Sequence, residues 1–207
     1  MIVASLLLTV QLHSSVIFKA NELRYIKEHF GQIAINRIND YKSTMNRIRK
    51  QPEHTHLNAV NNYVNQLLPM YDIYQHKVED YYETPKEFLS SGYGDCEDYV
   101  ALKYQSLMAL GFEEDLLYFS VVEDEIELGM HMVLLYYPNG YSESADPMVL
   151  DNLSFKVMPL SQRTDLTPKC AINQKYYITF DEFYNPRNRH NVQRQFAKLI
   201  KKLQNGQ

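Results

Sequence analysis

A cysteine that follows two glycines, in Gly92-Tyr-Gly-Asp-Cys-Glu-Asp98, constrains the fold of this 207-residue chain more than any other segment. Asp95 is a residue type that caps helices, and 99–110 contains no Gly or Pro before Gly111 supplies a stop. We therefore expect Cys96 in the first turn of a helix. Nearby carboxylates raise the pKa of a thiol, so a helix N-terminus, a cationic partner or a bound metal has to compensate.

The three acids beside the cysteine form a candidate metal site. At about 100° per residue, Asp95, Glu97 and Asp98 fall on one arc of the helix, and Cys96 points roughly away from its centre. Three hard oxygen donors suit Ca²⁺, whereas Zn²⁺ prefers sulfur or a histidine. A calcium ion there would offset the local negative charge. The alternative is that Asp95 caps the helix and the other acids favour its positive end.

A nucleophilic thiol needs a base and an orienting group, and both follow downstream. The segments 116–122, 130–137 and 147–152 are rich in strand-forming residues, with the turn-rich Pro138-Asn-Gly140 between the last two. His131 opens the second predicted strand and Asp151 closes the third. Alone, His131 is typical of a core histidine and Asp151 of a strand-end turn. Together with Cys96 they favour a Cys96–His131–Asp151 triad.

These residues resemble the motif blocks of a known family. The blocks are Gly92-Tyr-Gly-Asp-Cys-Glu-Asp-Tyr99, Gly129-Met-His-Met-Val-Leu134 and Met148-Val-Leu-Asp-Asn-Leu153, with similar flanks at 81–89 and 159–168. They are similar to those of the bacterial transglutaminase-like cysteine proteinase family, the LapG-type periplasmic adhesin proteases, over roughly residues 20 to 180. The family usually carries tryptophans, whereas this chain has none, and Tyr82 stands at one such position.

The resemblance implies the roles of these residues. Cys96 would be the nucleophile, His131 the base and Asp151 the orienting carboxylate, with Ca²⁺ held by Asp95, Glu97 and Asp98. It also implies a periplasmic protease that cuts a large surface adhesin near its N-terminus and so controls biofilm release. An inner-membrane receptor for cyclic di-GMP would inhibit it. Two alternatives remain: a transglutaminase-like acyl transferase with the same triad, and a catalytically silent peptide-binding module.

The expected fold class is α+β and papain/transglutaminase-like, with N-terminal helices and the nucleophile's helix packed against an antiparallel sheet. An apolar stripe predicts an amphipathic helix over 22–50, a second helix is expected over 57–68, and Thr84-Pro-Lys-Glu87 is typical of a capping box. We divide the chain into 1–18, a candidate signal or N-terminal segment, 19–183, the protease domain, and 184–207, a basic helical extension.

Composition excludes few classes of protein but limits the partners. The net charge of −4 argues against nucleic acid, and the apolar run at 2–10 is too short to span a membrane. That run lacks a preceding Lys or Arg, so its identity as a secretory signal rests on the family resemblance. A Cys96–Cys170 disulfide would block the nucleophile, so Cys170 is expected to be a lone buried thiol.

Overall fold

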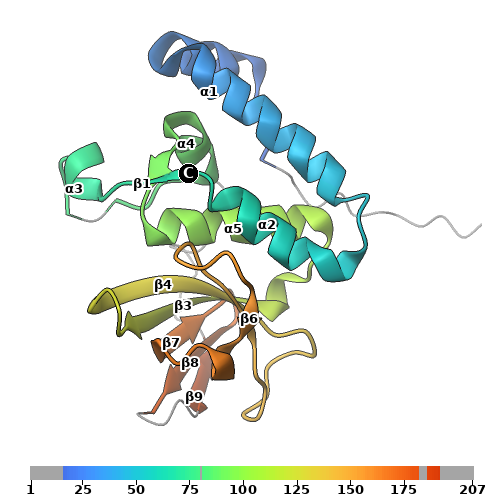
Figure 1. Ribbon diagram of the computed structural model, residues 1–207, viewed down its shortest axis with the longest axis vertical. Coiled ribbons are helices and arrows are strands. Elements are labelled where there is room, and N and C mark those ends of the chain that lie inside the picture. Colours follow the sequence, from blue (N-terminus) through green and yellow to red (C-terminus); the bar gives the residue numbers. More distant parts are fainter. Residues whose placement is uncertain (1–15, 80, 182–185, 192–207) are drawn as a thin grey trace, which may run out of the picture.

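The computed structural model describes residues 16–79 and 81–181, together with the backbone of 186–191. Its helices gather in one layer and its long strands in a second layer, below the helices in Figure 1. Helix α5 (Cys96–Leu110), which begins at the predicted nucleophile, lies between the other helices and the sheet. This arrangement confirms the predicted α+β fold, in which N-terminal helices precede and cover an antiparallel sheet.

The helices begin and end close to where the sequence predicts. Before α5 the described chain forms α1 (Ala20–Ile48), α2 (His56–Val64), α3 (Asp72–Gln75) and α4 (Pro85–Ser91). The predicted helices over 22–50 and 57–68 correspond to α1 and α2. Within α1, Gly31 has a φ of 76° and interrupts the helical geometry. The short helix α3 was not predicted.

The capping box before α4 is confirmed. The Glu87 backbone N–H donates to Thr84 Oγ1 at 3.2 Å, and the Thr84 N–H donates to Glu87 Oε2 at 2.8 Å. Pro85 occupies the first helical position, where its missing N–H is not needed. The helix ends at Gly92, whose φ of 79° suits glycine, so that the chain turns directly into the cysteine segment.

Within the described residues the main sheet has seven strands in the order β6-β5-β4-β3-β7-β8-β9, and all neighbouring pairs are antiparallel. The strands are β3 (Leu117–Asp124), β4 (Gly129–Tyr136), β5 (Met148–Leu150), β6 (Met158–Pro159), β7 (Leu166–Ile172), β8 (Tyr176–Phe180) and β9 (Pro186–Asn191). The three strands predicted between residues 116 and 152 correspond to β3, β4 and β5. They are consecutive neighbours, as expected.

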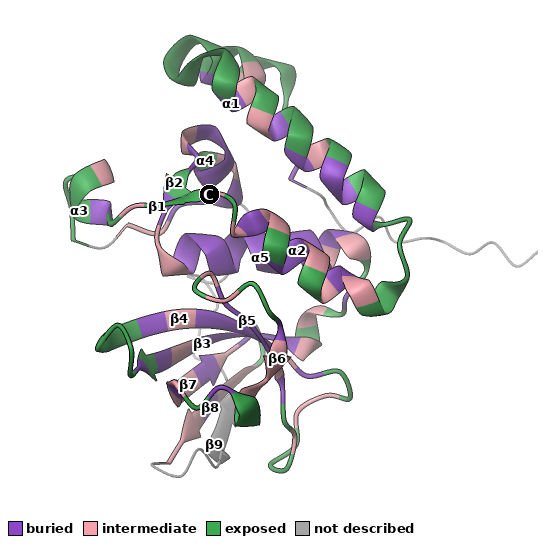
Figure 2. Ribbon diagram, in the orientation of Figure 1, coloured by how far each residue is buried: buried purple, intermediate pink, exposed green. Residues whose placement is uncertain are grey.

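Alternating residues of the strands build two cores. Leu117, Phe119 and Leu134 belong to the cluster between the sheet and the helices, whereas Tyr118 and Val133 belong to a second cluster on the far face. Figure 2 shows α5 as mostly buried. The position of Cys96 is therefore set by a helix that the core holds in place.

A short parallel ladder links two segments that are distant in the sequence. Strand β1 (Leu68–Pro69) pairs with β2 (Tyr93–Gly94), and the Met70 N–H donates to the Gly94 carbonyl at 2.9 Å. Helix α3 follows β1 directly. The ladder therefore places the start of α3 beside the segment that leads into Cys96.

The C-terminal region differs from the prediction. Residues 186–191 form strand β9 against β8, whereas the sequence predicted a basic helical extension over 184–207. The edge of β8 offers unpaired backbone groups, and pairing with them outweighs the local helical pattern. The rest of the predicted extension, 184–185 and 192–207, lies outside the described residues. So do residues 1–15 of the candidate signal segment. Among the described helices, none is long and apolar enough to cross a membrane.

Candidate active site

Cys96 is the first residue of α5, as predicted. Asp95 precedes the helix in an extended conformation, and its backbone N–H donates to Asp98 Oδ2 at 3.1 Å. Gly94 has to be a glycine here, because a Cβ at this position would lie 2.6 Å from Asp98 Oδ2. The backbone N–H groups at the start of α5 and the helix dipole favour negative charge at this end.

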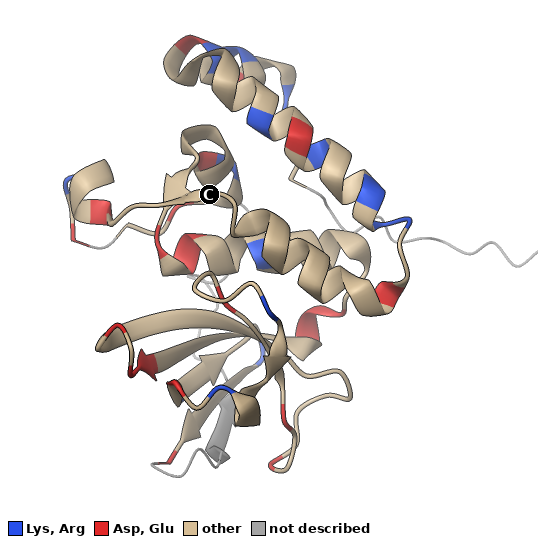
Figure 3. Ribbon diagram, in the orientation of Figure 1, with Lys and Arg blue, Asp and Glu red and all other residues tan. Residues whose placement is uncertain are grey.

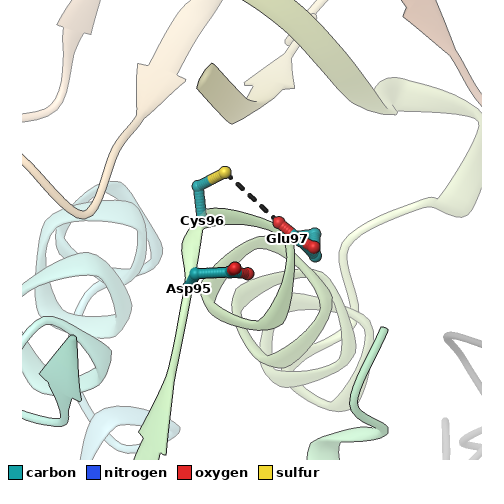
Figure 4. A group of neighbouring side chains, drawn as sticks. All are labelled: Asp95, Cys96 and Glu97. Atoms are coloured by element: carbon teal, nitrogen blue, oxygen red, sulfur yellow. Dashed lines mark hydrogen bonds between the residues drawn. The ribbon is translucent and has the colours of Figure 1, made fainter. Parts of the chain in front are cut away.

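The thiol itself lies in an acidic setting. Cys96 Sγ donates to Glu97 Oε2 at 3.3 Å, and Figure 4 shows Cys96, Glu97 and Asp95 gathered at the start of the helix. Burial and the Glu97 carboxylate raise the pKa of the Cys96 thiol far above its usual range, and a hydrogen bond from the Met132 backbone acts in the opposite direction. Met132 follows His131 on β4, so the thiol contacts the strand that carries the expected base.

His131 and Asp151 form a buried ion-pair geometry on neighbouring strands. His131 lies on β4 and Asp151 directly after β5, and Nε2 and Oδ1 are 2.8 Å apart. Their exposed fractions are 8% and 1%, so water competes little for this hydrogen bond. Burial raises the pKa of Asp151, but its bonds to His131, the Leu153 N–H and Arg163 outweigh burial and lower that pKa to about 2. Asp151 is therefore ionised at neutral pH.

Two groups of ligand atoms meet around Asp95, and only one of them consists of oxygens alone. Ligand atoms of Asp72, Asp95 and Asp98 lie within 4.8 Å of one another, and so do those of Asp95, Cys96 and Glu97. Figure 3 shows acidic residues at the start of α5 and of α3. Asp72 was not predicted, because its helix is too short to give a periodic pattern and its position depends on the β1–β2 ladder.

The oxygen-only group, Asp72 with Asp95 and Asp98, suits a hard cation. Asp72 is 2% exposed, and its Oδ1 makes no hydrogen bond within the described part of the chain, while Oδ2 accepts from the Tyr81 N–H. Burial and the neighbouring charges of Asp95 and Asp72 raise the pKa of Asp98 to about 8. Burial and Asp98 likewise raise the pKa of Glu83, whose backbone N–H donates to Asp98, to about 9. Clustered buried carboxylates of this kind fit a divalent cation with oxygen ligands.

The structure therefore brings Asp95 close to both of the other predicted ligands, since it shares one group with Glu97 and the other with Asp98. Asp72 joins the second group, and Glu97 lies beside the thiol. Both cysteines are free thiols, as predicted, but Cys170 is half-buried rather than buried.

A thiol at a helix N-terminus, packed against an antiparallel sheet that carries a histidine–carboxylate pair, defines the transglutaminase-like fold of the cysteine proteinases. The chain belongs to the family of bacterial transglutaminase-like cysteine proteinases (BTLCP), whose model matches residues 27–167. A search of curated protein sequences found no match.

Solved structures of LapG from Legionella pneumophila share this fold. One is 24% identical in sequence, covers 92% of this chain and 98% of the LapG chain, and has a TM-score of 0.69. An EGTA-treated LapG structure is 25% identical over 92% of this chain and 100% of its own, with a TM-score of 0.71. A calcium-bound LapG structure is 26% identical over 88% and 97%, with a TM-score of 0.69. These matches confirm the predicted papain/transglutaminase-like class.

Proposed function

We propose that this chain is a calcium-dependent cysteine endopeptidase, with Cys96 as nucleophile, His131 as base and Asp151 as the carboxylate that orients the base. One observation carries the proposal. His131 and Asp151 form a buried pair, with Nε2 and Oδ1 2.8 Å apart. The next residue after His131, Met132, is hydrogen-bonded through its backbone to Cys96, so the pair and the thiol lie at the same part of β4. Family membership supports the same reaction class.

The hydrogen bond to Asp151 sets the tautomer of the base. An ionised carboxylate only accepts hydrogen bonds, so Nε2 of His131 carries the proton and donates to Asp151 Oδ1. Nδ1 is then the basic nitrogen. It removes the proton of the Cys96 thiol as the sulfur forms a bond to the scissile carbonyl carbon.

The remaining steps return the enzyme to its starting state. The carbonyl oxygen takes up negative charge, which the backbone N–H groups at the start of α5 stabilise. The C–N bond breaks as His131 passes its proton to the leaving amine, and a thioester remains on Cys96. Water, deprotonated by His131, attacks the thioester and releases the acid product, and the thiol is restored.

Asp72, Asp95 and Asp98 would hold the calcium ion. Two observations support this assignment: Asp72 Oδ1 has no hydrogen-bond partner among the described residues, and the pKa of Asp98 is raised. Bound there, the cation would neutralise carboxylates next to Cys96 and so favour the thiolate. Glu97, the third ligand expected from the sequence, lies within 4.8 Å of a ligand atom of Asp95, and its carboxylate accepts from the Cys96 thiol. A calcium-bound structure of LapG supports the choice of metal.

For the substrate and the regulator, the proposal rests on the resemblance to the family. We infer a periplasmic enzyme that cuts the N-terminal region of a large surface adhesin and so releases cells from a biofilm. An inner-membrane receptor for cyclic di-GMP would act as its inhibitor.

Cleavage of an adhesin's N-terminal fragment, followed on gels, tests the proposal. Wild type should cut the fragment in the presence of calcium, and Cys96→Ala should not, although its circular dichroism and unfolding midpoint match wild type. Removal of bound calcium with a selective chelator should also stop cleavage. A fragment cut equally well by Cys96→Ala would remove the nucleophile assignment.

The same samples separate the alternatives. Cross-linked products in the presence of a primary amine would indicate acyl transfer in place of hydrolysis. A Cys96 that reacts with iodoacetamide at pH 7 no faster than Cys170 would indicate a silent peptide-binding module, because an activated thiolate alkylates quickly. If cleavage continues in the chelator after the metal has been shown to be lost, the acids beside Cys96 would be assigned to helix capping instead of metal binding.

A further inference from the structure

A third buried charged group contacts the His131–Asp151 pair. Arg163, which follows the 3₁₀ turn Leu160–Gln162, is 6% exposed, and its Nη2 donates to Asp151 Oδ2 at 2.7 Å. The proposed reaction gives this arginine no role. A cation placed so deep in the fold is stabilised only by the carboxylates that it contacts.

A second carboxylate holds the arginine in place. Arg163 Nε donates to both Asp165 oxygens, at 2.9 Å and 3.1 Å, and Nη2 donates to Asp165 Oδ2 at 2.5 Å. The guanidinium is planar, so these bonds fix the orientation of the nitrogen that reaches Asp151. Asp165 is only partly buried and belongs to the turn before β7.

The two oxygens of Asp151 therefore have separate partners. Oδ1 accepts from His131 and from the Leu153 N–H at 2.9 Å, and Oδ2 accepts from Arg163. A carboxylate bound at one oxygen alone can rotate and take the imidazole with it. Bonds at both oxygens leave it one orientation, and the histidine ring follows.

We propose that Arg163, clamped by Asp165, is a positioning residue that fixes Asp151 and through it the orientation of His131 toward Cys96. This inference rests on the proposed function and extends it, because it assigns a role to a segment that carries none of the triad. The charged groups that face Asp151 are His131 from β4, Arg163 itself, Asp165 beside it and the buried Lys103 of α5. Lys103 lies further away and makes no hydrogen bond to Asp151 among those that the structure describes, so it cannot orient the carboxylate.

Steady-state cleavage by Arg163→Met and Arg163→Lys over a range of pH tests the proposal. We expect Arg163→Met to lower kcat by about tenfold to a hundredfold, the loss typical of a misplaced reacting group, with KM changed less than about threefold. The acidic limb of its pH–rate profile should move to higher pH, because a buried Asp151 that has lost the Arg163 guanidinium takes up a proton more readily. Arg163→Lys keeps the positive charge, so its acidic limb should lie close to the wild-type pH.

Two further variants make the result decisive. Arg49→Met removes an arginine that donates to the Ala109 carbonyl at 3.2 Å, at the far end of α5, and should leave kcat and the limb unchanged. Asp165→Asn weakens the bonds that hold Arg163 but keeps Arg163 itself. It should lower kcat and move the acidic limb to higher pH, as Arg163→Met does, but by less. If Arg163→Met does not fold, Arg163→Lys and Asp165→Asn decide, and wild-type kcat and acidic limb in both would overturn the proposal.

Alkylation of Cys96 by iodoacetamide at pH 7 separates this inference from the proposed function. If Cys96 reacts no faster in wild type than in His131→Gln, the proposed triad is wrong, and the role of Arg163 is wrong with it. Fast, His131-dependent alkylation in wild type that Arg163→Met leaves unchanged, with kcat also unchanged, would keep the triad and overturn the role of Arg163 alone.

Discussion

A carboxylate oxygen of Asp72, at the start of α3, lies within 4.8 Å of one of Asp98, on the first turn of α5. The two residues come together because β1 and β2 pair in parallel, which brings the start of α3 beside the start of α5. The site that we assign to calcium therefore includes a residue from outside the cysteine motif.

Calcium binding should depend more on Asp72 than on Glu97. Asp72→Asn removes a buried charge that faces Asp95 and Asp98, so calorimetry should show an affinity weakened by about tenfold or more. Glu97→Gln changes a side chain on the thiol side and should weaken binding by less than about threefold. The reverse ranking would favour the ligand set expected from the sequence, with Glu97 in place of Asp72.

The histidine–carboxylate pair should control the reactivity of the thiol. Asp151→Asn leaves the shape of the site but favours the wrong tautomer of His131, so alkylation of Cys96 at pH 7 should slow by about a hundredfold, as should cleavage. His56→Gln is the control. His56 is also a buried histidine, but it is bonded to the Gln51 carbonyl at 3.0 Å, and its substitution should leave alkylation at the wild-type rate. Equal rates in Asp151→Asn and wild type would contradict the role of Asp151.

Gly94 should not tolerate a side chain. A Cβ there would meet Asp98 Oδ2 at 2.6 Å and Phe88 Cδ2 at 2.9 Å, so Gly94→Ala has to displace Asp98. We expect weaker calcium binding, measured by calorimetry, and slower cleavage. Gly129→Ala meets nothing within 4 Å and should keep the wild-type calcium affinity. If Gly94→Ala binds calcium as wild type does, Asp98 is not a ligand.

Lys103 should destabilise the fold at neutral pH. It is fully buried, its Nζ has no hydrogen bond within the described residues, and burial lowers its pKa from 10.5 to about 7. Between about pH 7 and 10.5 the unfolded chain binds more protons at this lysine than the folded chain, so stability rises with pH. Lys103→Met should therefore raise the free energy of unfolding at pH 7 by roughly 1 kcal/mol or more.

The pH dependence provides the check on Lys103. Denaturant unfolding of wild type and Lys103→Met should differ most at pH 7 and below, and the difference should shrink as the pH approaches 10. A constant difference over this range would show that the effect comes from packing rather than from the buried charge.

Local signals were enough to predict the parts of the chain that position Cys96. The capping box at Thr84, the cap at Asp95 and the stop at Gly111 are short-range features, and the structure has all three helix ends there. Strands β3, β4 and β5 were predicted because each is a continuous run of strand-forming residues.

Long-range pairing could not be predicted in the same way. Asp72 belongs to a four-residue helix, too short for an apolar period, and only the β1–β2 ladder gives it a place. Strand β9 forms where the local sequence favours a helix, because the edge of β8 is available to it. The roles of Arg163 and Asp165 likewise depend on a contact between the segment after β5 and the segment before β7, which no spacing along the chain indicates.

The two-layer architecture divides the proposed triad. Cys96 belongs to the helical layer, whereas His131 and Asp151 belong to the sheet, and the apolar cluster between the layers sets the register of one against the other. Catalytic activity should therefore respond to the packing between the layers more sensitively than any spectroscopic measure of helix or strand content. Mild denaturation that lets the layers move relative to one another should abolish activity while the secondary structure is still intact.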